Sequence, residues 1–323
     1  MSKFLRVFFI TTGTFLLLGT TPVSAEEIPK VKFDFSDYES KKEHSDTPEI
    51  NFGPPTEEYN PELKVDLNEL DDYFKTDLEP EFNTHVIIGP DNRQQVSNPG
   101  SYPHSTIAQL TMQWEYGNNT VCSGTLIDSN SVLTAGHCLI DTGSRPGGEQ
   151  GRLLSVQVVP GRNGSTAPHG VAYGVSVHVP AEYANQRSSD YDYGVINLNA
   201  NLSSAGSMGL TSLNNTELAN TTFTVSGYPG DKAREQGNYF QWFHSGRTTQ
   251  VNNLTVRYHI DTMGGQSGAP LFFAPNSPFA TRYIAGVHSA GASDSNGNGL
   301  YNISKRLTNS SNNLIHSWAA LNN

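Results

Sequence analysis

The residues Leu133-Thr134-Ala135-Gly136-His137-Cys138 form an apolar, strand-like run that ends in small residues beside a histidine. The chain has only two cysteines, Cys122 and Cys138, and in an exported protein two cysteines are expected to pair. Their bridge would stabilise the fold by about 3 kcal/mol in the chain-entropy model, and it would pin the backbone beside the imidazole. Most of the ten histidines are expected to be structural, but this context favours a catalytic role for His137.

A second run, Gly264-Gly265-Gln266-Ser267-Gly268-Ala269-Pro270, presents a serine on a tight, glycine-rich loop. Nucleophilic acyl transfer needs such a serine, together with backbone N–H groups aimed at the carbonyl oxygen that becomes negative. The N–H groups of Gly265 and Ser267 are the natural candidates for this oxyanion hole. Glycine-rich turns that contain serine are common, so the motif gains its weight from its position after the His-Cys pair and a candidate aspartate.

Two aspartates are candidates for the group that orients the imidazole of His137 and stabilises its protonated form. Asp190 and Asp192 both lie in the stretch Ser189-Asp190-Tyr191-Asp192-Tyr193-Gly194-Val195-Ile196-Asn197-Leu198. We choose Asp192, because it stands immediately before a strand-like run that could hold it beside His137. Asp190 remains the alternative and is otherwise expected to be solvated.

Together these motifs resemble those of the chymotrypsin-like serine peptidases, which have His, Asp and Ser in this order with Thr-Ala-Gly-His-Cys and Gly-x-Ser-Gly-x-Pro signatures. Four stretches look more specifically like the glutamyl endopeptidases of Gram-positive bacteria: residues 192–194, 227–232, 241–246 and 261–268. The resemblance covers nearly all of residues 86–323. It implies an all-β fold of two antiparallel six-stranded β-barrels with a C-terminal helix, the first barrel spanning about 86–200 and the second about 201–323. The triad would lie between them, with His137 and Asp192 from the first barrel and Ser267 from the second.

The same resemblance implies a pocket for an acidic substrate side chain, lined by Thr262 and His288. A carboxylate that enters a partly buried pocket loses hydration, so it needs positive charge and hydrogen-bond donors in return. The imidazole and the hydroxyl can both donate, and the α-ammonium group of Val86 would add charge once the chain is cut. The expected activity is therefore hydrolysis of peptide bonds after Glu, and less readily after Asp, through an acyl-enzyme.

Two other interpretations compete with this one. Asp261 stands six residues before Ser267, which is the spacing at which trypsin-like enzymes hold the carboxylate that selects Lys or Arg. If Asp261 faced the pocket, the specificity would invert. The chain could also be a peptidase-fold binding protein without turnover, because a closed pocket or a malformed oxyanion hole would be invisible in the sequence.

Maturation should differ from that of trypsin-like zymogens. In those proteins the new N-terminal ammonium pairs with an Asp directly before the catalytic Ser, but here that position is Gln266, whose uncharged amide cannot form the ion pair. The run Val86-Ile87-Ile88, followed by Asp91-Asn92-Arg93, resembles the start of mature glutamyl endopeptidases. We therefore expect an activating peptidase to cut between His85 and Val86, with Ile87 as the nearest competing start.

The chain begins with an expected export signal. Lys3 and Arg6 precede a mostly apolar run over residues 7–19, and Val23-Ser24-Ala25 supplies small residues for cleavage after Ala25. A membrane anchor is the weaker interpretation, because threonines interrupt a run already shorter than the roughly 20 residues that span a bilayer. The mature product is expected to be secreted, extracellular and outside the membrane, with protein or peptide substrates.

The charge divides the exported chain into two parts. Residues 26–85 contain 6 Lys and 18 Asp or Glu, a net charge of −12, whereas residues 86–323 carry a net charge of only −1. The acidic part cannot bury enough apolar area to offset chain entropy, so we interpret it as a propeptide, with a simple acidic linker as the alternative. The peptidase part offers little basic surface for nucleic acid. We expect a monomer without cofactor or catalytic metal, and no ligand cluster is strong enough to claim a structural calcium.

Residues 86–323 also show the short alternating runs that are typical of antiparallel β structure. Examples are residues 156–159, 175–179, 223–225 and 255–260, separated by turn-forming stretches at 160–164, 228–231 and 296–299. This pattern alone is equally compatible with a sandwich and a barrel. The spacing of apolar residues over 303–321 is compatible with a terminal helix, although residues 309–313 are expected to interrupt it.

Overall fold

The structure is a computed structural model that describes residues 49–51, 86–116, 119–141, 151–275 and 281–322. All of them belong to one compact unit. The predicted signal peptide, residues 1–25, and most of the predicted propeptide, residues 26–85, lie outside the described residues. The cleavage positions expected after Ala25 and after His85 therefore stay predictions.

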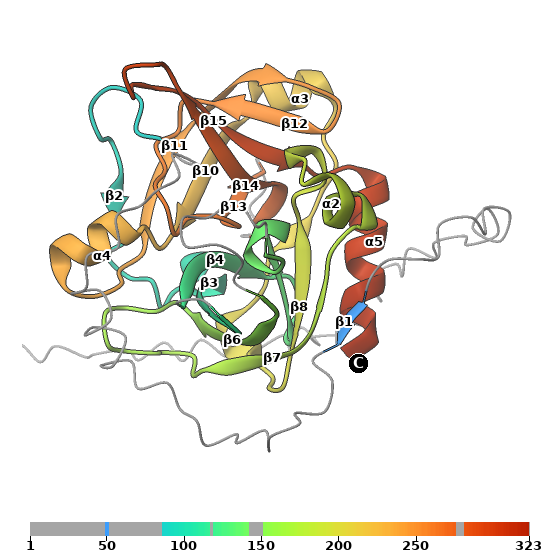
Figure 1. The fold of residues 1–323 in the computed structure, drawn as a ribbon. Helices are drawn as coiled ribbons and strands as arrows, with labels where there is room; N and C mark the ends of the chain where they lie inside the picture. Colours follow the sequence, from blue (N-terminus) through green and yellow to red (C-terminus); the bar gives the residue numbers. More distant parts are fainter. Residues whose placement is uncertain (1–48, 52–85, 117–118, 142–150, 276–280, 323) are drawn as a thin grey trace, which may run out of the picture. The chain divides into compact units, whose positions relative to one another are not determined.

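Six antiparallel strands close the first barrel (Figure 1). They are β3 (Ile107–Trp114), β4 (Thr120–Leu126), β5 (Ser131–Thr134), β6 (Leu153–Pro160), β7 (Ala172–His178) and β8 (Gly194–Leu198). Their order is β7-β6-β3-β4-β5-β8, and the pairing of β7 with β8 closes the ring. The short strand β1 (Glu49–Asn51) adds to β7. Closure distinguishes a barrel from a sandwich, because it leaves no open sheet edge.

The second barrel follows the same plan. Its strands are β10 (Thr222–Gly227), β11 (Trp242–Val251), β12 (Thr255–Tyr258), β13 (Pro270–Phe273), β14 (Tyr283–Ser293) and β15 (Gly299–Arg306). They run in the order β10-β13-β14-β15-β12-β11, and β10 pairs with β11 to close the barrel. The two predicted six-stranded antiparallel barrels are confirmed.

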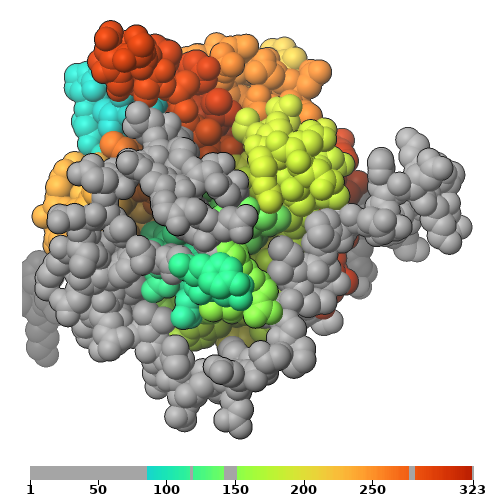
Figure 2. All heavy atoms as spheres, in the orientation of Figure 1, coloured from blue at the N-terminus to red at the C-terminus, as the bar shows by residue number. Residues whose placement is uncertain are grey.

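Two short strands extend the second barrel at its sides. Strand β9 (Gly209–Leu210) runs parallel to β14, and β2 (Gln94–Gln95) pairs with β11. Strand β2 falls within the range predicted for the first barrel, yet it belongs to the sheet of the second. The segment that follows residue 86 is therefore wrapped onto the second barrel, and Figure 2 shows it beside the β14–β15 hairpin.

The apolar runs singled out in the sequence are strands. Residues 156–159 lie within β6 and residues 223–225 within β10, whereas β7 ends one residue earlier than the run at 175–179 and β12 ends at Tyr258. The stretch at 228–231 does not simply turn, because helix α4 (Gly230–Gln236) begins inside it. The other α-helices of the described part are α2 (Ala181–Gln186), α3 (Asn215–Asn220) and α5 (Asn309–Ala319), and short 3-10 helices include the turns Gly136–Cys138 and Ser189–Tyr191.

The C-terminal helix is present, but its predicted start and interruption were wrong. Residues 303–306 belong to β15, and the asparagine-rich stretch forms the first turns of α5 instead of breaking it. Thr308 caps this helix by accepting from the N–H of Ser311, while the Ser311 hydroxyl accepts from the N–H of Thr308. Short polar side chains near a helix start stabilise it by such caps.

The cores join the two barrels through α5. A larger buried cluster fills the first barrel and continues to Ile315 and Trp318 of α5 and to Val287 of β14, and a smaller cluster around Phe223 and Tyr258 fills the second barrel. The shared packing fixes the barrels against each other, which is what a site built from both of them requires. No helix within the described ranges has the length and apolarity to cross a bilayer.

Candidate active site

The first barrel brings His137 and Asp192 together because of how two neighbouring strands pair. Strands β5 and β8 are antiparallel with Thr134 opposite Gly194, so the residues that leave β5 meet those that enter β8. Asp192 accepts from the backbone N–H of His137 at 2.9 Å through Oδ1, and its Oδ2 lies 2.7 Å from Nδ1 of the imidazole. Asp190 lies instead in the partly exposed turn Ser189–Tyr191.

The carboxylate of Asp192 is buried and fully engaged. Burial opposes its ionisation, but attraction to His137 and hydrogen bonds from His137 and Ser289 together hold the pKa of Asp192 below its usual value. The Ser289 hydroxyl donates a short hydrogen bond to Oδ2. An ionised acceptor at Nδ1 holds the proton on that nitrogen and leaves Nε2 as the basic one.

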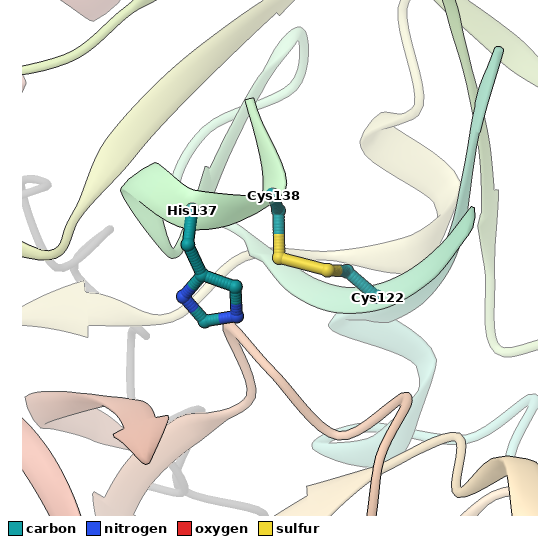
Figure 3. Close-up of side chains that lie close together, drawn as sticks. All are labelled: Cys122, His137 and Cys138. Atoms are coloured by element: carbon teal, nitrogen blue, oxygen red, sulfur yellow. A yellow bond between two sulfur atoms is a disulfide. The ribbon is translucent and has the colours of Figure 1, made fainter. Parts of the chain in front are cut away.

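The predicted disulfide between Cys122 of β4 and Cys138 is present, with the two Cα atoms 6.3 Å apart. Figure 3 shows the imidazole of His137 and the sulfur of Cys138 leaving the same short turn, with the bridge running to the neighbouring strand. Within the described residues these three side chains are the only ones grouped closely enough to hold a metal ion. Both sulfurs are joined to each other, so the cluster has no thiolate ligands and does not fit a metal.

The loop that carries Ser267 leaves the second barrel and is seated on the first. Ser267 is only 6% exposed, and its carbonyl accepts from the N–H of Ser123 at 2.8 Å. Gly268 has φ +80°, and a Cβ there would collide with Thr134 and with the carbonyl of Ser123, so only glycine allows the approach. Thr134 lies just before the turn that carries His137, and Ser123 follows Cys122, whose disulfide holds that turn. The serine loop is therefore seated beside His137.

The predicted oxyanion donors lie on peptides whose carbonyl groups are anchored elsewhere. The carbonyl of Gly264 accepts from the N–H of Gly230 at 2.7 Å, and that of Gln266 accepts from the N–H of Ala269 at 3.0 Å. The C=O and N–H of a trans peptide point in opposite directions. The hydrogen bonds to the Gly264 and Gln266 carbonyls therefore direct the N–H groups of Gly265 and Ser267 away from Gly230 and Ala269. Two fixed N–H groups in one loop are what an oxyanion hole requires.

The predicted pocket residues sit directly behind this loop. His288 and Thr262 are fully buried, and the backbone of His288 bonds to Gly268 and Ala269, with both N···O distances 2.8 Å. Among the described residues the Thr262 hydroxyl oxygen is buried without a hydrogen-bond partner, so a ligand that reached it would supply the missing hydrogen bond.

His288 is held in its neutral form. Burial, with repulsion from His137, lowers its pKa to about 3. Its Nδ1 lies 2.6 Å from the hydroxyl of Tyr258, which in turn lies 2.7 Å from the hydroxyl of Ser304. A Tyr258 hydroxyl that donates to Nδ1 leaves the proton of the imidazole on Nε2.

Val86 is buried against the pocket wall. Its N–H donates to Oδ1 of Asn302 at 3.0 Å, and its carbonyl accepts from Nδ2 of Asn302 at 2.7 Å and from the N–H of Thr262 at 3.3 Å. The position expected to become the mature N-terminus therefore adjoins Thr262. Asn302 and Ser304 were missed in the sequence, although two polar side chains at alternate positions of a strand, both facing a core, are a detectable signal.

The carboxylate of Asp261 is occupied by backbone and side-chain groups outside the predicted pocket residues. Its buried carboxylate accepts from the N–H of Ile88 at 2.8 Å and from the N–H of Asn92 at 2.9 Å, and it lies 3.3 Å from Nδ1 of His244. Both oxygens thus bind the segment that follows Val86. This placement argues against the competing interpretation in which Asp261 selects Lys or Arg.

Comparison with known proteins finds a family model, several curated relatives and solved structures that match this chain. The trypsin family model matches residues 93–314. A glutamyl endopeptidase of Bacillus licheniformis is 34% identical over 198 residues, which are 61% of this chain and 58% of that protein, so less than two thirds of its length is matched. A Bacillus subtilis protein named extracellular metalloprotease is 30% identical over 250 residues, 76% of this chain and 74% of that protein. The solved structure of a Glu endopeptidase in complex with MPD has a TM-score of 0.62 and 35% identity, covering 73% of this chain and 100% of that chain.

Proposed function

Because the chain belongs to the trypsin family, we propose that it is a secreted serine endopeptidase that cleaves peptide bonds after glutamate, and less readily after aspartate. The observation that carries the proposal is the pair of buried Asp192 with partly exposed His137, beside which the loop bearing Ser267 is seated. The glutamyl endopeptidases among its relatives and the matching Glu endopeptidase structure support the substrate class.

Each group has one task in the proposed reaction. His137 takes the proton of Ser267 through Nε2 as the hydroxyl oxygen attacks the peptide carbonyl, and it later gives that proton to the leaving amine. The negative oxygen of the tetrahedral intermediate binds the N–H groups of Gly265 and Ser267. Asp192 keeps the imidazole in the correct tautomer and stabilises its cationic form without taking the proton. Water then hydrolyses the acyl-enzyme by the same route.

Selection of glutamate requires a source of positive charge in the pocket. Thr262 and His288 offer hydrogen bonds, but a histidine with a pKa of about 3 is uncharged at neutral pH. A cut between His85 and Val86 would convert the N–H that Asn302 holds into an α-ammonium group, whose ordinary pKa is near 8. The charge that compensates the substrate carboxylate would thus be created by maturation.

The name of the Bacillus subtilis relative suggests a second class of peptidase, a metal-dependent one. Cys122, His137 and Cys138 do not supply a metal site because of the disulfide. A chelator and a serine-directed inhibitor added separately to the matured protein distinguish the two classes, since the proposed mechanism is blocked only by the second.

The decisive experiment is to mature the protein, read its N-terminus and map its cleavage sites on a denatured protein mixture. We expect Val86 at the N-terminus and cuts that cluster after Glu, and we expect Ser267→Ala to abolish them. Cuts after Lys or Arg would defeat the proposed specificity. A correctly matured protein that cuts nothing would favour a binding role for the fold.

A further inference from the structure

The segment that follows the proposed cleavage site ends in a buried arginine. The side chain of Arg93 is 1% exposed, and its guanidinium group binds the carboxylate of Asp231 with both terminal nitrogens, Nη1 at 3.0 Å and Nη2 at 2.5 Å. Asp91 accepts from Nε at 3.0 Å and from Nη2 at 2.9 Å. Two carboxylates thus compensate the buried charge of Arg93. The two hydrogen bonds from its planar guanidinium group neutralise the charge of Asp231 and also fix the position of that carboxylate.

Asp231 stands next to a residue that positions the predicted oxyanion hole. It follows Gly230 in α4, which lies beside β2 (Figure 1). The N–H of Gly230 holds the carbonyl of Gly264 at 2.7 Å, and that carbonyl belongs to the same peptide group as the N–H of Gly265. If Gly230 moved away, this peptide would lose the bond that sets its orientation.

The loop lacks the ion pair that trypsin-like enzymes use at this place. Gln266 occupies the position before Ser267, and its side chain turns back on the loop, where Oε1 accepts from the N–H of Met263 at 3.0 Å. This bond is local and does not reach the segment that begins at Val86. Asp261 and Thr262, which precede the oxyanion loop, bind the segment directly, and α4 adds a second connection that reaches the Gly264 carbonyl itself.

We propose that the Arg93–Asp231 ion pair is the latch that couples the seated N-terminal segment to the orientation of the Gly265 N–H. This inference rests on the proposed peptidase function. Arg93 is then a positioning residue, which acts through Asp231 and Gly230 without touching the substrate. The latch predicts that breaking the pair weakens stabilisation of the transition state and leaves substrate binding almost unchanged.

The segment is fixed on both sides of the latch. Asp261 holds the N–H of Asn92, directly before Arg93, and β2 begins directly after it. Lys232 lies 3.4 Å from Asp91, so the outer carboxylate is shared between two cations. The hydrogen bond from Arg93 lowers the pKa of Asp91 to about 2, which keeps this side of the cluster ionised at any pH at which the enzyme would work.

The test compares Asp231→Asn and Arg93→Gln with Lys232→Gln, all in the matured protein. Lys232→Gln is the matched control, because it removes a charge from the same helix and the same cluster but leaves the Arg93–Asp231 pair intact. Loss of one oxyanion donor lowers kcat by about 100-fold to 1,000-fold, so a donor that is misoriented part of the time should cost about 10-fold to 100-fold. We expect this loss in kcat for both latch variants, a KM within about twofold, and wild-type values for Lys232→Gln.

A second readout isolates the oxyanion hole. A peptide aldehyde ending in glutamate forms a hemiacetal with the serine and places its oxygen among the oxyanion donors, whereas the corresponding alcohol cannot. The latch variants should bind the aldehyde about 10-fold or more weakly and the alcohol equally well, and a double variant should be no worse than either single one. Thermal unfolding and N-terminal sequencing identify variants that merely fail to fold or mature.

The outcomes separate the latch from the function on which it rests. If the matured wild type cleaves a glutamyl substrate and the latch variants keep their kcat, or raise only KM, the latch is refuted while the peptidase assignment stands. An equal loss in Lys232→Gln refutes it too, since that effect would come from the charge of the cluster. A matured wild type without activity would refute both.

Discussion

Replacement of Asn302 by alanine tests whether the residue that holds Val86 sets the preference for glutamate. Asn302 makes three buried hydrogen bonds, to the N–H and the carbonyl of Val86 and to the carbonyl of Ile260 at 2.9 Å. In the matured protein the hydrogen bond between Val86 and Oδ1 of Asn302 would involve an α-ammonium group. A hydrogen bond to a charged partner contributes about 1.5–3 kcal/mol of free energy. Loss of that positioning should lower kcat/KM for a glutamyl substrate by about 10-fold to 100-fold.

The assay uses two peptide substrates that differ only in Glu or Gln at the cleaved residue. The Gln substrate has the shape of the Glu substrate without the charge, so the ratio of the two kcat/KM values isolates charge compensation. We expect the ratio to fall in Asn302→Ala, mainly through KM, and to stay constant in Asn296→Ala, whose exposed side chain lies at the tip of the β14–β15 hairpin. The variant should also unfold at a lower temperature, by roughly 6–12 °C for about 3 kcal/mol lost in a domain of this size.

An unchanged Glu-to-Gln ratio in a folded, matured Asn302→Ala protein would refute this reasoning. The positive charge would then have to come from another group, or the pocket would have to bind glutamate through hydrogen bonds alone. A fall of both substrates by the same factor would also contradict it, because such a loss would reflect general distortion of the site.

Three further changes have defined outcomes. The pair Cys122→Ala/Cys138→Ala opens a loop with a sequence separation of 16 and should cost about 3 kcal/mol of unfolding free energy, measured by urea unfolding. Asp261→Asn weakens the hydrogen bonds that hold the N-terminal segment, so it should lower activity and thermal stability while cleavage maps still show cuts after Glu; wild-type cuts after Lys or Arg that disappear in this variant would contradict the assignment. Burial lowers the pKa of Lys305 from 10.5 to about 8, so the folded protein binds fewer protons than the unfolded chain between these values and stability should rise with pH there. Lys305→Met should therefore raise the unfolding free energy at pH 7 by about 1–3 kcal/mol, with the gain disappearing above about pH 10.5.

The barrels and the position of the serine loop could be predicted because their signals are local or familial. The alternating runs in β6 and β10 predict strands directly. The run that ends in His137 and Cys138 is recognised from a few adjacent residues, so it needs no information about distant parts of the chain. The pairing of two cysteines needs no further information when there are only two. By contrast, the asparagine-rich start of α5 looked like an interruption, because a capping box with Thr308 depends on one rotamer that composition does not reveal.

The contacts that surround the site could not be predicted in the same way. Asn302 reaches Val86 across 216 positions of the chain, and Arg93 reaches Asp231 across 138. A sequence shows that polar residues stand in a strand or a helix, but it does not show which distant backbone group each one satisfies. Such partners follow from the position of the segment that precedes β2 on the second barrel, whereas the sequence prediction assigned this segment to the first barrel.

The two proposed roles of this segment divide between its ends, and the division explains why the position of the cut matters. Val86 is held by Asn302 beside Thr262, whereas Arg93 is bound to the helix that anchors the oxyanion loop. A chain that began at Ile87 would keep the second contact and lose the first, because its ammonium group would lie one residue beyond Asn302. The two proposals therefore place transition-state stabilisation and charge compensation at opposite ends of eight residues of one segment, and together they predict that only a start at Val86 supplies both.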